Sequence, residues 1–492
     1  MAFISGIGLT LAFPPYDIVV ALTAYSALLL LMEAGEKAAR RAWVDRMLIG
    51  AAFGFGAHLM GLWWVGLAFL VDADRYAALM PLAVIGLPLI LAPFTALATV
   101  LCGLAPQRLA WRALALALAI SFTEWLRGMV FTGFPWNVAG VGITQSTLLA
   151  QSASVVGLTG LSFVAVLFGT LPAVLIEKKS RWLAVPAGII LAVMAGFGAQ
   201  RLLSAPALAD DAPLIRVVQP AIPQRDKWDP EQRDMIWERL LQLTEEDRPN
   251  GGFDAVIWPE TAIPFLYRTP SAEQAALAGA LSGASLITGA VDMERIDGRV
   301  RTTNSVFVMD PDGALAARYD KAHLVPFGEY VPLAGVLSWL GFKALAAGDA
   351  VFEAGPGPTT IRHRDLPRFQ PLICYEIIFP HLRADGAAQW IVNVTNDAWF
   401  GNTPGPRQHL RHARLRAIAR GVPVVRAANT GISAVIDSSG QISEFVPLNT
   451  IGIITTRLPN PHPSVYSVLG DLPIFGLWFV GAFGVLVARR LT

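Results

Sequence analysis

The chain has 492 residues, of which 54% are hydrophobic and 15% are charged, and its mean hydropathy is +0.50. Average soluble domains carry roughly 25% charged residues, so this composition indicates a membrane protein. The net charge of +1 does not suggest a nucleic-acid partner, and two cysteines cannot build a disulfide framework.

Long apolar runs dominate the first 202 residues and recur near the C-terminus. A helix that crosses a bilayer needs about 20 apolar residues. The first run is short and ends at Phe13-Pro14-Pro15, which predicts a tilted or re-entrant segment. No Lys or Arg precedes Lys37, unlike the front of a cleavable signal peptide, so we expect this first segment to be retained. About eight spans are predicted, near residues 2–14, 17–32, 47–71, 79–103, 109–126, 153–176, 182–202 and 472–488.

Basic residues gather in alternate loops between these runs. By the positive-inside tendency, such loops face the cytoplasm. Residues 203–471 then lie on the extracytoplasmic side, between a bundle at 1–202 and a last helix at 472–492. The basic loop residues are Lys37, Arg40, Arg41, Arg46, Arg108, Arg112, Lys178, Lys179, Arg181, Arg489 and Arg490.

Residues 203–471 read as a soluble α/β domain of ordinary size. "DPDG" at 310–313 and "DSSG" at 437–440 predict hairpin turns. Ser271 and Gln274 form a capping box, and Asp229-Pro230 predicts another helix start. The pattern predicts an α/β sandwich with mixed or antiparallel pairing. Strand-like runs occur at 215–220, 254–260, 285–291, 304–309, 369–374, 390–394, 422–426 and 433–436.

Three chemically different side chains stand at the ends of apolar runs in this domain: Glu260 in "AVIWPE", Lys321 in "ARYDKAHL" and Cys374 in "FQPLICYE". An ammonium lowers the pKa of a nearby thiol, a carboxylate can move the proton, and the ammonium can hold an oxyanion. Each residue alone has a commoner explanation: a solvated lysine, a capping or ion-paired glutamate, a small core cysteine. Spacing does not show that they meet.

The three residues, in this order, resemble the Glu-Lys-Cys triad of the nitrilase superfamily. Over its whole length the chain resembles the apolipoprotein N-acyltransferase family, which implies an extracytoplasmic nitrilase-like α-β-β-α sandwich on a membrane bundle. The similar stretches are "FPPYD" at 13–17, "GFPWN" at 133–137, "VVQPAIPQRDKWDP" at 217–230, "WPE" at 258–260, "YDKAHLVPFGEYVP" at 319–332, "CYE" at 374–376 and "NDAWFGNTPGPRQHL" at 396–410.

The resemblance implies a role for each matching residue. Glu260 is expected to be the general base, Lys321 the electrostatic stabiliser that keeps the sulfur charged, and Cys374 the nucleophile. The residues expected to support them are Glu329, which backs the triad, and Tyr375 and Glu376, which flank the nucleophile.

Aromatic residues near the outer ends of the runs have two readings. Trp228 matches a tryptophan on a mobile arm near the entrance, and Trp136 and Trp399 are candidates for contact with lipid. The other reading is the interfacial belt that aromatic residues form in any membrane protein. Glu124 and Arg127, which end the fifth run, either contact headgroups or snorkel to the interface.

The reaction implied by the resemblance is acyl transfer between lipids. An acyl chain of a phospholipid, typically phosphatidylethanolamine, would pass to Cys374 as a thioester. It would then pass to the N-terminal amine of diacylglyceryl-cysteine on an apolipoprotein, the last step of lipoprotein maturation. The resemblance places the chain in a bacterial inner membrane with the catalytic domain on the periplasmic side.

No cofactor or metal is expected. The chain has no nucleotide-binding glycine motif in context, and His409 and His412 have no evident third ligand beside them. Two other functions stay open at this point: a membrane-tethered nitrilase-like amidase, and a transporter with an extracytoplasmic domain. The amidase leaves most of the bundle unexplained, and the transporter is disfavoured because the spans hold few charges.

Overall fold

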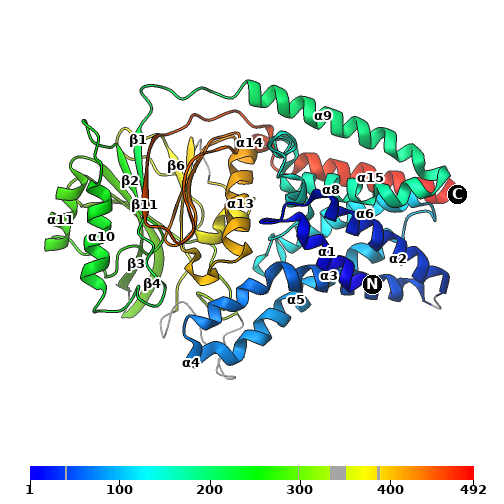
Figure 1. Ribbon diagram of the computed structural model, residues 1–492, viewed down its shortest axis with the longest axis horizontal. Helices are drawn as coiled ribbons and strands as arrows, with labels where there is room; N and C mark the ends of the chain where they lie inside the picture. The colour runs from blue at the N-terminus through cyan, green and yellow to red at the C-terminus, as the bar shows by residue number, and fades with distance from the viewer. Residues whose placement is uncertain (39–40, 297, 333–350, 385–387, 492) are drawn as a thin grey trace.

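A helical bundle and a two-sheet α/β region lie end to end along the long axis of the molecule (Figure 1). The computed structural model describes residues 1–38, 41–296, 298–332, 351–384 and 388–491. The bundle is built from the first 203 residues and the C-terminal helix, which returns to pack beside it.

Seven helical segments of the described residues are long and apolar enough to cross a membrane. The first apolar run is an eighth, shorter segment, Ala2–Ala12, in which helix α1 covers Ala2–Leu9. It is the segment for which the sequence predicts a tilted or re-entrant course. The long helices are α2 (Ala24–Ala38), α3 (Ala42–Leu62), α5 (Met80–Cys102), α6 (Leu109–Arg127), α8 (Ala153–Ile176), α9 (Ala184–Leu203) and α15 (Leu472–Leu491).

The ends of the bundle helices that carry basic residues converge on one another. Glu36, near the end of α2, pairs with Arg46 at the start of α3 and with Arg112 at the start of α6. Arg489, in the last turn of α15, donates to the carbonyl of Leu104, just after α5. Figure 1 shows the end of α2, the α8–α9 connection and the end of α15 at the end of the bundle far from the sheets. The basic loops therefore share one end of the bundle.

The α/β region contains two mixed sheets packed face to face. The first has the strand order β11-β1-β2-β3-β4-β5 and the second β10-β9-β8-β7-β6. Ile257 and Ile287 of the first sheet share a buried core with Leu372 and Ile391 of the second. The strands are β1 (Leu214–Gln219), β2 (Ala255–Ile257), β3 (Ser285–Ile296), β4 (Arg299–Met309), β5 (Leu315–Asp320), β6 (Phe369–Ile373), β7 (Trp390–Thr395), β8 (Val424–Ala428), β9 (Ser433–Ile436), β10 (Ile442–Val446) and β11 (Gly452–Arg457).

Helices cover both outer faces of this sandwich. Helices α10 (Arg233–Glu245) and α11 (Ala272–Leu281) pack on the first sheet through an apolar core that includes Leu240 and Leu277. Helix α13 (Pro404–Arg420) covers the second sheet and lies between it and the bundle (Figure 1). The predicted α-β-β-α sandwich is thus confirmed, and one of its outer helices is also the contact layer with the bundle.

Local signals predicted some element ends correctly and others wrongly. The hydroxyl of Ser271 accepts the predicted cap hydrogen bond from the backbone of Gln274. The helix expected to start at Asp229-Pro230 starts instead at Arg233, because the Asp229 carboxylate caps a separate turn by accepting from the backbone N–H of Glu231. The hairpin turns predicted at 310–313 and 437–440 connect β4 with β5 and β9 with β10. Strand β11 was not predicted, since exposed and apolar residues mix along this short edge segment.

Candidate active site

Three loops at strand ends bring the predicted catalytic residues together. Lys321 follows β5 directly and Cys374 follows β6 directly, whereas Glu260 lies three residues beyond β2. The structure therefore draws two of them from the first sheet and one from the second. All three are buried, with exposed fractions of 6% for Glu260, 1% for Lys321 and 8% for Cys374.

Lys321 lies between two carboxylates. Its Nζ donates to Oε1 of Glu329 over 2.9 Å and lies 3.8 Å from Oε1 of Glu260. The side-chain amide of Asn304 donates to both of these oxygens, at 2.8 Å to Glu260 and 2.9 Å to Glu329. The backbone N–H of Val325 holds the other Glu329 oxygen at 2.8 Å. Glu329 is thus the carboxylate that holds the Lys321 ammonium by a direct hydrogen bond, and its supporting role in the reaction stays a prediction.

Close backbone packing sets the place of Glu260. The N–H of Gly289 in β3 donates to the carbonyl of Pro259, and the N–H of Ala262 donates to the carbonyl of Gly289. A Cβ at Gly289 would lie 2.5 Å from the Cα of Glu260, closer than any real Cβ contact. Only glycine lets β3 approach the Glu260 loop this closely.

Cys374 occupies a sharp bend between β6 and a short 3-10 helix (Cys374–Ile378). Its φ of +54° lies in the left-handed region, which non-glycine residues rarely adopt and which is frequent at functional sites. The carbonyl of Cys374 accepts a hydrogen bond from the Asn393 side chain at 3.2 Å and contacts Nε2 of His409 at 3.2 Å. These contacts support the strained bend that presents the sulfur.

Glu376 ties the nucleophile loop to the lysine loop. Its carboxylate accepts hydrogen bonds from the backbone N–H groups of Ala322, His323 and Ile373, at 2.7 to 3.0 Å, and from the hydroxyl of Tyr319. Ala322 follows Lys321 and Ile373 precedes Cys374, so one buried carboxylate holds the ammonium and the thiol in register. Glu376 thus connects the two loops through hydrogen bonds, and its part in activity stays a prediction.

Tyr375 reaches over the same loops. Its hydroxyl donates to the carbonyl of Leu324 over 2.6 Å, and the Lys321 ammonium lies 5.5 Å from the centre of its ring. The aromatic face helps to hold the cation in place.

The ionisation of the site differs from the sequence-based expectation in one respect. Burial, followed by the charge of Glu260, raises the pKa of the Cys374 thiol, and the opposing effect of Lys321 does not overcome them. Burial also raises the pKa of Glu260. Burial would lower the pKa of Lys321, but Glu329 and Glu260 raise it. The expectation that Lys321 keeps the sulfur charged is therefore wrong for the resting site, where burial and Glu260 favour the thiol.

A second buried layer lies beneath the nucleophile. Asp397 pairs with Arg426 over 2.6 Å and with Nδ1 of His409 over 2.9 Å, and none of the three is exposed. Burial raises the pKa of Asp397, but Arg426 and His409 outweigh it and bring it to about 2. The Arg426 guanidinium also donates to Asn393. This ionic layer carries the two side chains that contact the Cys374 carbonyl.

Lys227 is a buried ammonium that sequence reasoning missed. Its Nζ donates to the backbone carbonyl of Glu260 over 2.8 Å, and burial lowers its pKa to about 8. Asn304, Asp397 and Arg426 were missed as well. The signal for Asn304 and Arg426 was a polar residue interrupting an apolar run, as in "TTNSVFV" and "PVVRAA", whereas Lys227 and Asp397 lie within the family-like stretches 217–230 and 396–410.

The three predicted lipid-contact tryptophans lie in different environments. Trp228 follows Lys227 and is 49% exposed. Trp136 is 2% exposed and donates from Nε1 to Gln408 of α13, so lipid could reach it only after a rearrangement. Trp399 is half-buried in the 3-10 turn Asp397–Phe400.

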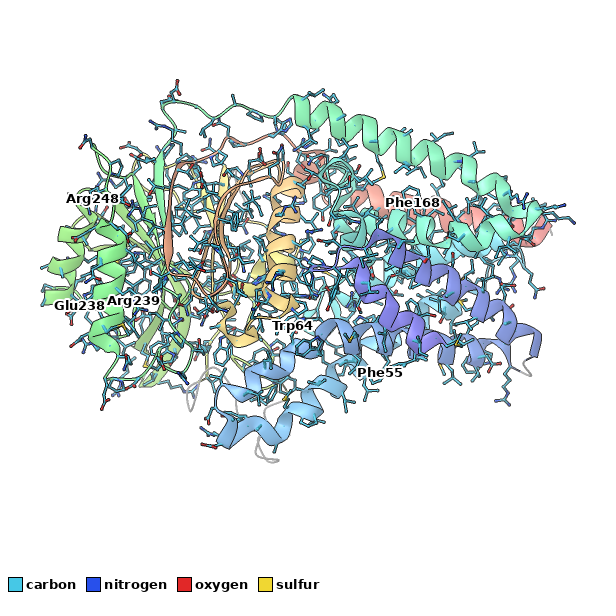
Figure 2. All side chains as sticks on the ribbon, in the orientation of Figure 1. Phe55, Trp64, Phe168, Glu238, Arg239 and Arg248 are labelled. Carbon is cyan, nitrogen blue, oxygen red and sulfur yellow. The ribbon has the colours of Figure 1, made fainter. Side chains whose placement is uncertain are left out.

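Aromatic rings that meet at tilted and edge-to-face angles join the bundle to α13. Trp64, which Figure 2 labels at this junction, packs against Trp136 at 5.1 Å and against Phe400 at 4.6 Å between ring centres. Trp136 also contacts the rings of His409 and His412. Among the described residues no group of three or more His, Cys, Asp or Glu side chains could hold a metal ion.

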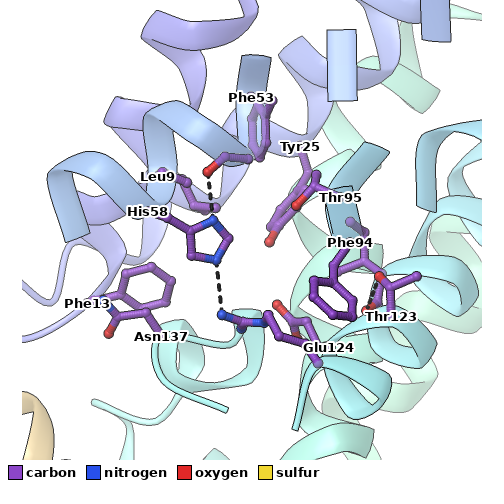
Figure 3. Close-up of a pocket in the computed structure, with 14 residues that line it drawn as sticks. Leu9, Phe13, Tyr25, Phe53, His58, Phe94, Thr95, Thr123, Glu124 and Asn137 are labelled. Atoms are coloured by element: carbon purple, nitrogen blue, oxygen red, sulfur yellow. Dashed lines mark hydrogen bonds between the residues drawn. The ribbon is translucent and has the colours of Figure 1, made fainter. Parts of the chain in front are cut away.

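Glu124 and Arg127 turn into the bundle instead of toward its surface. Arg127 is 3% exposed and bonds Nε2 of His58 over 3.0 Å, while Glu124, which Figure 3 labels within the bundle, accepts from the backbone N–H of Ala139. They border a cavity of about 30 Å³, room for about two water molecules. Neither of the two predicted readings, headgroup contact or snorkelling, describes this arrangement.

Comparison with known proteins agrees with the two-part architecture. The carbon–nitrogen hydrolase family model matches residues 214–461, and the model of the apolipoprotein N-acyltransferase N-terminal domain matches residues 5–171. Fold and sequence therefore define a carbon–nitrogen hydrolase domain joined to a membrane bundle.

Curated relatives match almost the whole chain. The apolipoprotein N-acyltransferase of Brucella melitensis biotype 1 is 42% identical over 481 residues, covering 94% of this chain and 90% of its own. That of Rhodopseudomonas palustris is 40% identical over 483 residues, covering 94% and 89%. This chain belongs to the apolipoprotein N-acyltransferase family. An amidase of the nitrilase superfamily from Nesterenkonia AN1 aligns with 56% of this chain and 99% of its own, at 18% identity and a TM-score of 0.38.

Proposed function

We propose that this chain transfers an acyl chain from a membrane phospholipid, through a thioester on Cys374, to the N-terminal amine of diacylglyceryl-cysteine on an apolipoprotein. The observation that carries the proposal is the buried cluster of Glu260, Lys321 and Cys374 in a chain of this family. Seven long apolar helices of the described residues accompany that cluster and supply the means to bring lipids to it.

In the first half-reaction, Glu260 takes the proton from the Cys374 thiol as the sulfur attacks the ester carbonyl of the donor. A buried carboxylate with a raised pKa is well matched to this proton transfer. The Lys321 ammonium stabilises the oxyanion that forms. Glu260 then returns the proton to the departing alkoxide, which leaves a lysophospholipid and a thioester on Cys374.

In the second half-reaction, the free α-amine of the acceptor attacks the thioester. Glu260 takes a proton from the attacking amine, and the Cys374 thiolate departs and is reprotonated. An amide is formed from a thioester, a downhill step that needs no nucleotide. The buried position of all three residues supports exclusion of water, the competing nucleophile.

A bundle of many helices can keep the acyl chain of the donor out of water. Moving a sixteen-carbon chain into water costs about 0.8 kcal/mol per CH₂, or about 12 kcal/mol. Helices that cover the chain while its ester reaches Cys374 avoid that cost. We assign residues 1–202 and 472–492 to the membrane part and residues 203–471 to the catalytic domain. A tethered amidase would need a single helix, so the bundle disfavours that alternative.

We further propose phosphatidylethanolamine as the donor and the bacterial inner membrane as the location, with the catalytic domain on the periplasmic side. The orientation is supported by the basic helix ends, such as Arg46, Arg112 and Arg489, which gather at the end of the bundle opposite the sheets (Figure 1). Positive residues favour the cytoplasmic face. A reporter fused within residues 203–471 that reads as cytoplasmic would contradict this orientation.

The proposed function is tested by intact mass spectrometry of the purified protein after incubation with phosphatidylethanolamine carrying a labelled acyl chain. We expect one acyl adduct that maps to Cys374 and disappears when a diacylglyceryl-cysteine peptide is added, with formation of the triacylated peptide. Cys374→Ala is expected to form no adduct while keeping its fold. Transfer to the peptide by Cys374→Ala at the parent rate would refute the mechanism.

A further inference from the structure

A short segment of chain links the ends of strands in both sheets. Residues 220–228, which we call the crossing segment, follow β1 of the first sheet. The backbone N–H of Ile222 donates to the Asn429 side chain over 2.9 Å, and that side chain donates back to the Ile222 carbonyl over 2.7 Å. Gln224 accepts from the Asn396 side chain over 2.6 Å. Asn396 and Asn429 directly follow β7 and β8, so the crossing segment is fixed to the second sheet.

Lys227 fixes the crossing segment to the first sheet as well. Its Nζ donates over 2.8 Å to the backbone carbonyl of Glu260, in the loop that follows β2. The lysine is buried, with an exposed fraction of 4%. Within the described part of the chain this ammonium forms no ion pair. The loop of the proposed base is therefore held by a charge whose hydrogen-bond partner is a carbonyl and not a carboxylate.

The crossing segment places its side chains against their ordinary preferences. Lysine is almost never fully buried unless it is paired, whereas tryptophan is usually well buried. Here Lys227 lies inside, while Trp228 beside it is 49% exposed and the Arg225 side chain is 80% exposed. Burial of an ammonium costs free energy that packing alone does not return. A departure from the local rule of this kind is expected at a functional site.

The Glu260 loop needs support from outside because its backbone is strained. Thr261 has a φ of +46°, in the left-handed region that non-glycine residues rarely adopt. Such a conformation persists only where the surrounding structure holds it. The N–H of Gly289 holds the carbonyl of Pro259 on one side of Glu260. On the other side, Lys227 binds the peptide group that joins Glu260 to Thr261.

We propose that Lys227 is a positioning residue for the reaction: its ammonium fixes the carbonyl of Glu260 and so sets the place of the Glu260 carboxylate beside Lys321. It acts through Glu260 and not by contact with the substrate. A hydrogen bond from a charged donor is stronger than one from a neutral donor, so a lysine holds the loop better than an uncharged side chain would. The assignment rests on the proposed function insofar as Glu260 is the base of that reaction.

The charge of Lys227 also acts on the carboxylate that it positions. Burial raises the pKa of Glu260, and the groups around it act in both directions. Lys321 lowers this pKa, Glu329 raises it, and the hydrogen bond from Asn304 and the charge of Lys227 lower it. Removal of the charge at residue 227 should therefore raise the pKa of Glu260, an effect that a merely structural residue would not have.

Lys227 itself is charged at neutral pH. Burial lowers its pKa to about 8, and the charges of Glu260 and then of an ionised Cys374 act against that decrease. An arginine in its place would keep the positive charge, since a guanidinium is always protonated. Variants at this one position can therefore separate the charge from the side chain.

The test is single-turnover formation of the acyl adduct from labelled phosphatidylethanolamine across a pH series. Lys227→Met keeps the length of the side chain and removes both the charge and the hydrogen bond. Its plateau rate is expected to fall at least about tenfold, because a misplaced base loses rate steeply. Its acid limb should move to higher pH, because Glu260 is protonated more readily without the charge of Lys227. Lys227→Arg should keep the acid limb of the parent.

Lys227→Met is expected to fold, because an apolar side chain replaces a buried charge. Lys227→Gln provides the same pH test if the methionine variant is unstable, since glutamine is also uncharged and its acid limb should also move to higher pH.

Arg225→Met is the matched control. It removes the same charge from the crossing segment on the solvent side, where water screens it, so neither the plateau rate nor the acid limb should change. An acid limb of Lys227→Met that stays at the pH of the parent would make Lys227 a structural residue and overturn the proposal. So would an acid limb of Lys227→Arg that moves as far as that of Lys227→Met, since the shift would then not follow the charge.

A second measurement does not depend on activity. The backbone N–H of Ala262 donates to the carbonyl of Gly289, and its hydrogen exchange reports how firmly the Glu260 loop is held. Exchange in the fragment 258–263 should be faster in Lys227→Met than in the parent, and unchanged exchange would overturn the anchoring of the loop by Lys227. Failure of the proposed function would appear instead as the absence of an acyl adduct in the parent, whatever the exchange result.

Discussion

Lys321 donates a hydrogen bond to Glu329 over 2.9 Å, whereas Glu260 lies 3.8 Å from the same ammonium. The lysine is thus anchored by the supporting carboxylate and not by the proposed base. Glu260 keeps one oxygen bonded to Asn304 and stays available to move a proton. The two glutamates therefore differ in their contacts: Glu329 anchors the lysine, and Glu260 is the proposed base.

Glu329→Gln should weaken Glu260 as a base. Loss of the nearer carboxylate shifts the Lys321 ammonium toward Glu260, and loss of the like charge of Glu329 also lowers the pKa of Glu260. We expect the acid limb of the rate of acyl-adduct formation to move to lower pH, and the plateau rate to fall at least about tenfold. Single-turnover rates measured across a pH series check this; an acid limb that does not move would contradict it.

Glu376 should make stability depend on pH. Burial raises its pKa from 4.5 to about 7, so the folded state holds a proton that the unfolded state has already released. The stabilisation is complete below pH 4.5 and is lost as pH rises through 7, an effect of about 3 kcal/mol. Relative to Glu376→Gln, the parent's free energy of unfolding should fall across this window. Glu353→Gln, at a position 57% exposed, is the control and should follow the parent; parallel curves for parent and Glu376→Gln would refute the assignment.

Asp397→Asn should lower both the free energy of unfolding and the rate of acyl-adduct formation. It leaves the Arg426 guanidinium buried without its carboxylate, a change that costs about 3–5 kcal/mol. It also releases His409, which contacts the carbonyl of Cys374, so adduct formation should slow in whatever fraction stays folded. Denaturant unfolding and single-turnover labelling check the two parts. Asp234→Asn, at a position 92% exposed, should change neither, and a fully stable Asp397→Asn would show that the buried pair is dispensable.

Gly289→Ala should displace Glu260, the proposed base, while leaving its carboxylate group unchanged. The new Cβ would lie 2.5 Å from both the Cα of Glu260 and the N of Thr261, so one of the two segments must shift. A displacement of about 1 Å can cost roughly 100-fold in rate. Gly279→Ala in α11 is the matched control, because nothing lies within 4 Å of its Cβ and a helical alanine is favoured by up to about 1 kcal/mol. Equal rates of adduct formation in the two variants would contradict this account of Glu260.

Sequence patterns foresaw features that are carried by short stretches of chain. The apolar runs predicted the seven long helices, because the thickness of a bilayer sets the number of consecutive apolar residues that a spanning helix needs. The hairpin turns and the Ser271 cap were found because a few adjacent residues decide them. Glu260, Lys321 and Cys374 were singled out by family-like motifs, and the structure places all three around one buried site.

Tertiary structure alone decided the relations between distant segments. No local pattern links Lys227 to Glu260, or Asp397 to Arg426, because each pair is brought together only when the loops pack. The family resemblance implied that Lys321 would lie near the sulfur, but not that burial and Glu260 would outweigh its charge and favour a thiol. Charge interactions depend on distance and on the exclusion of water, and the folded chain sets both.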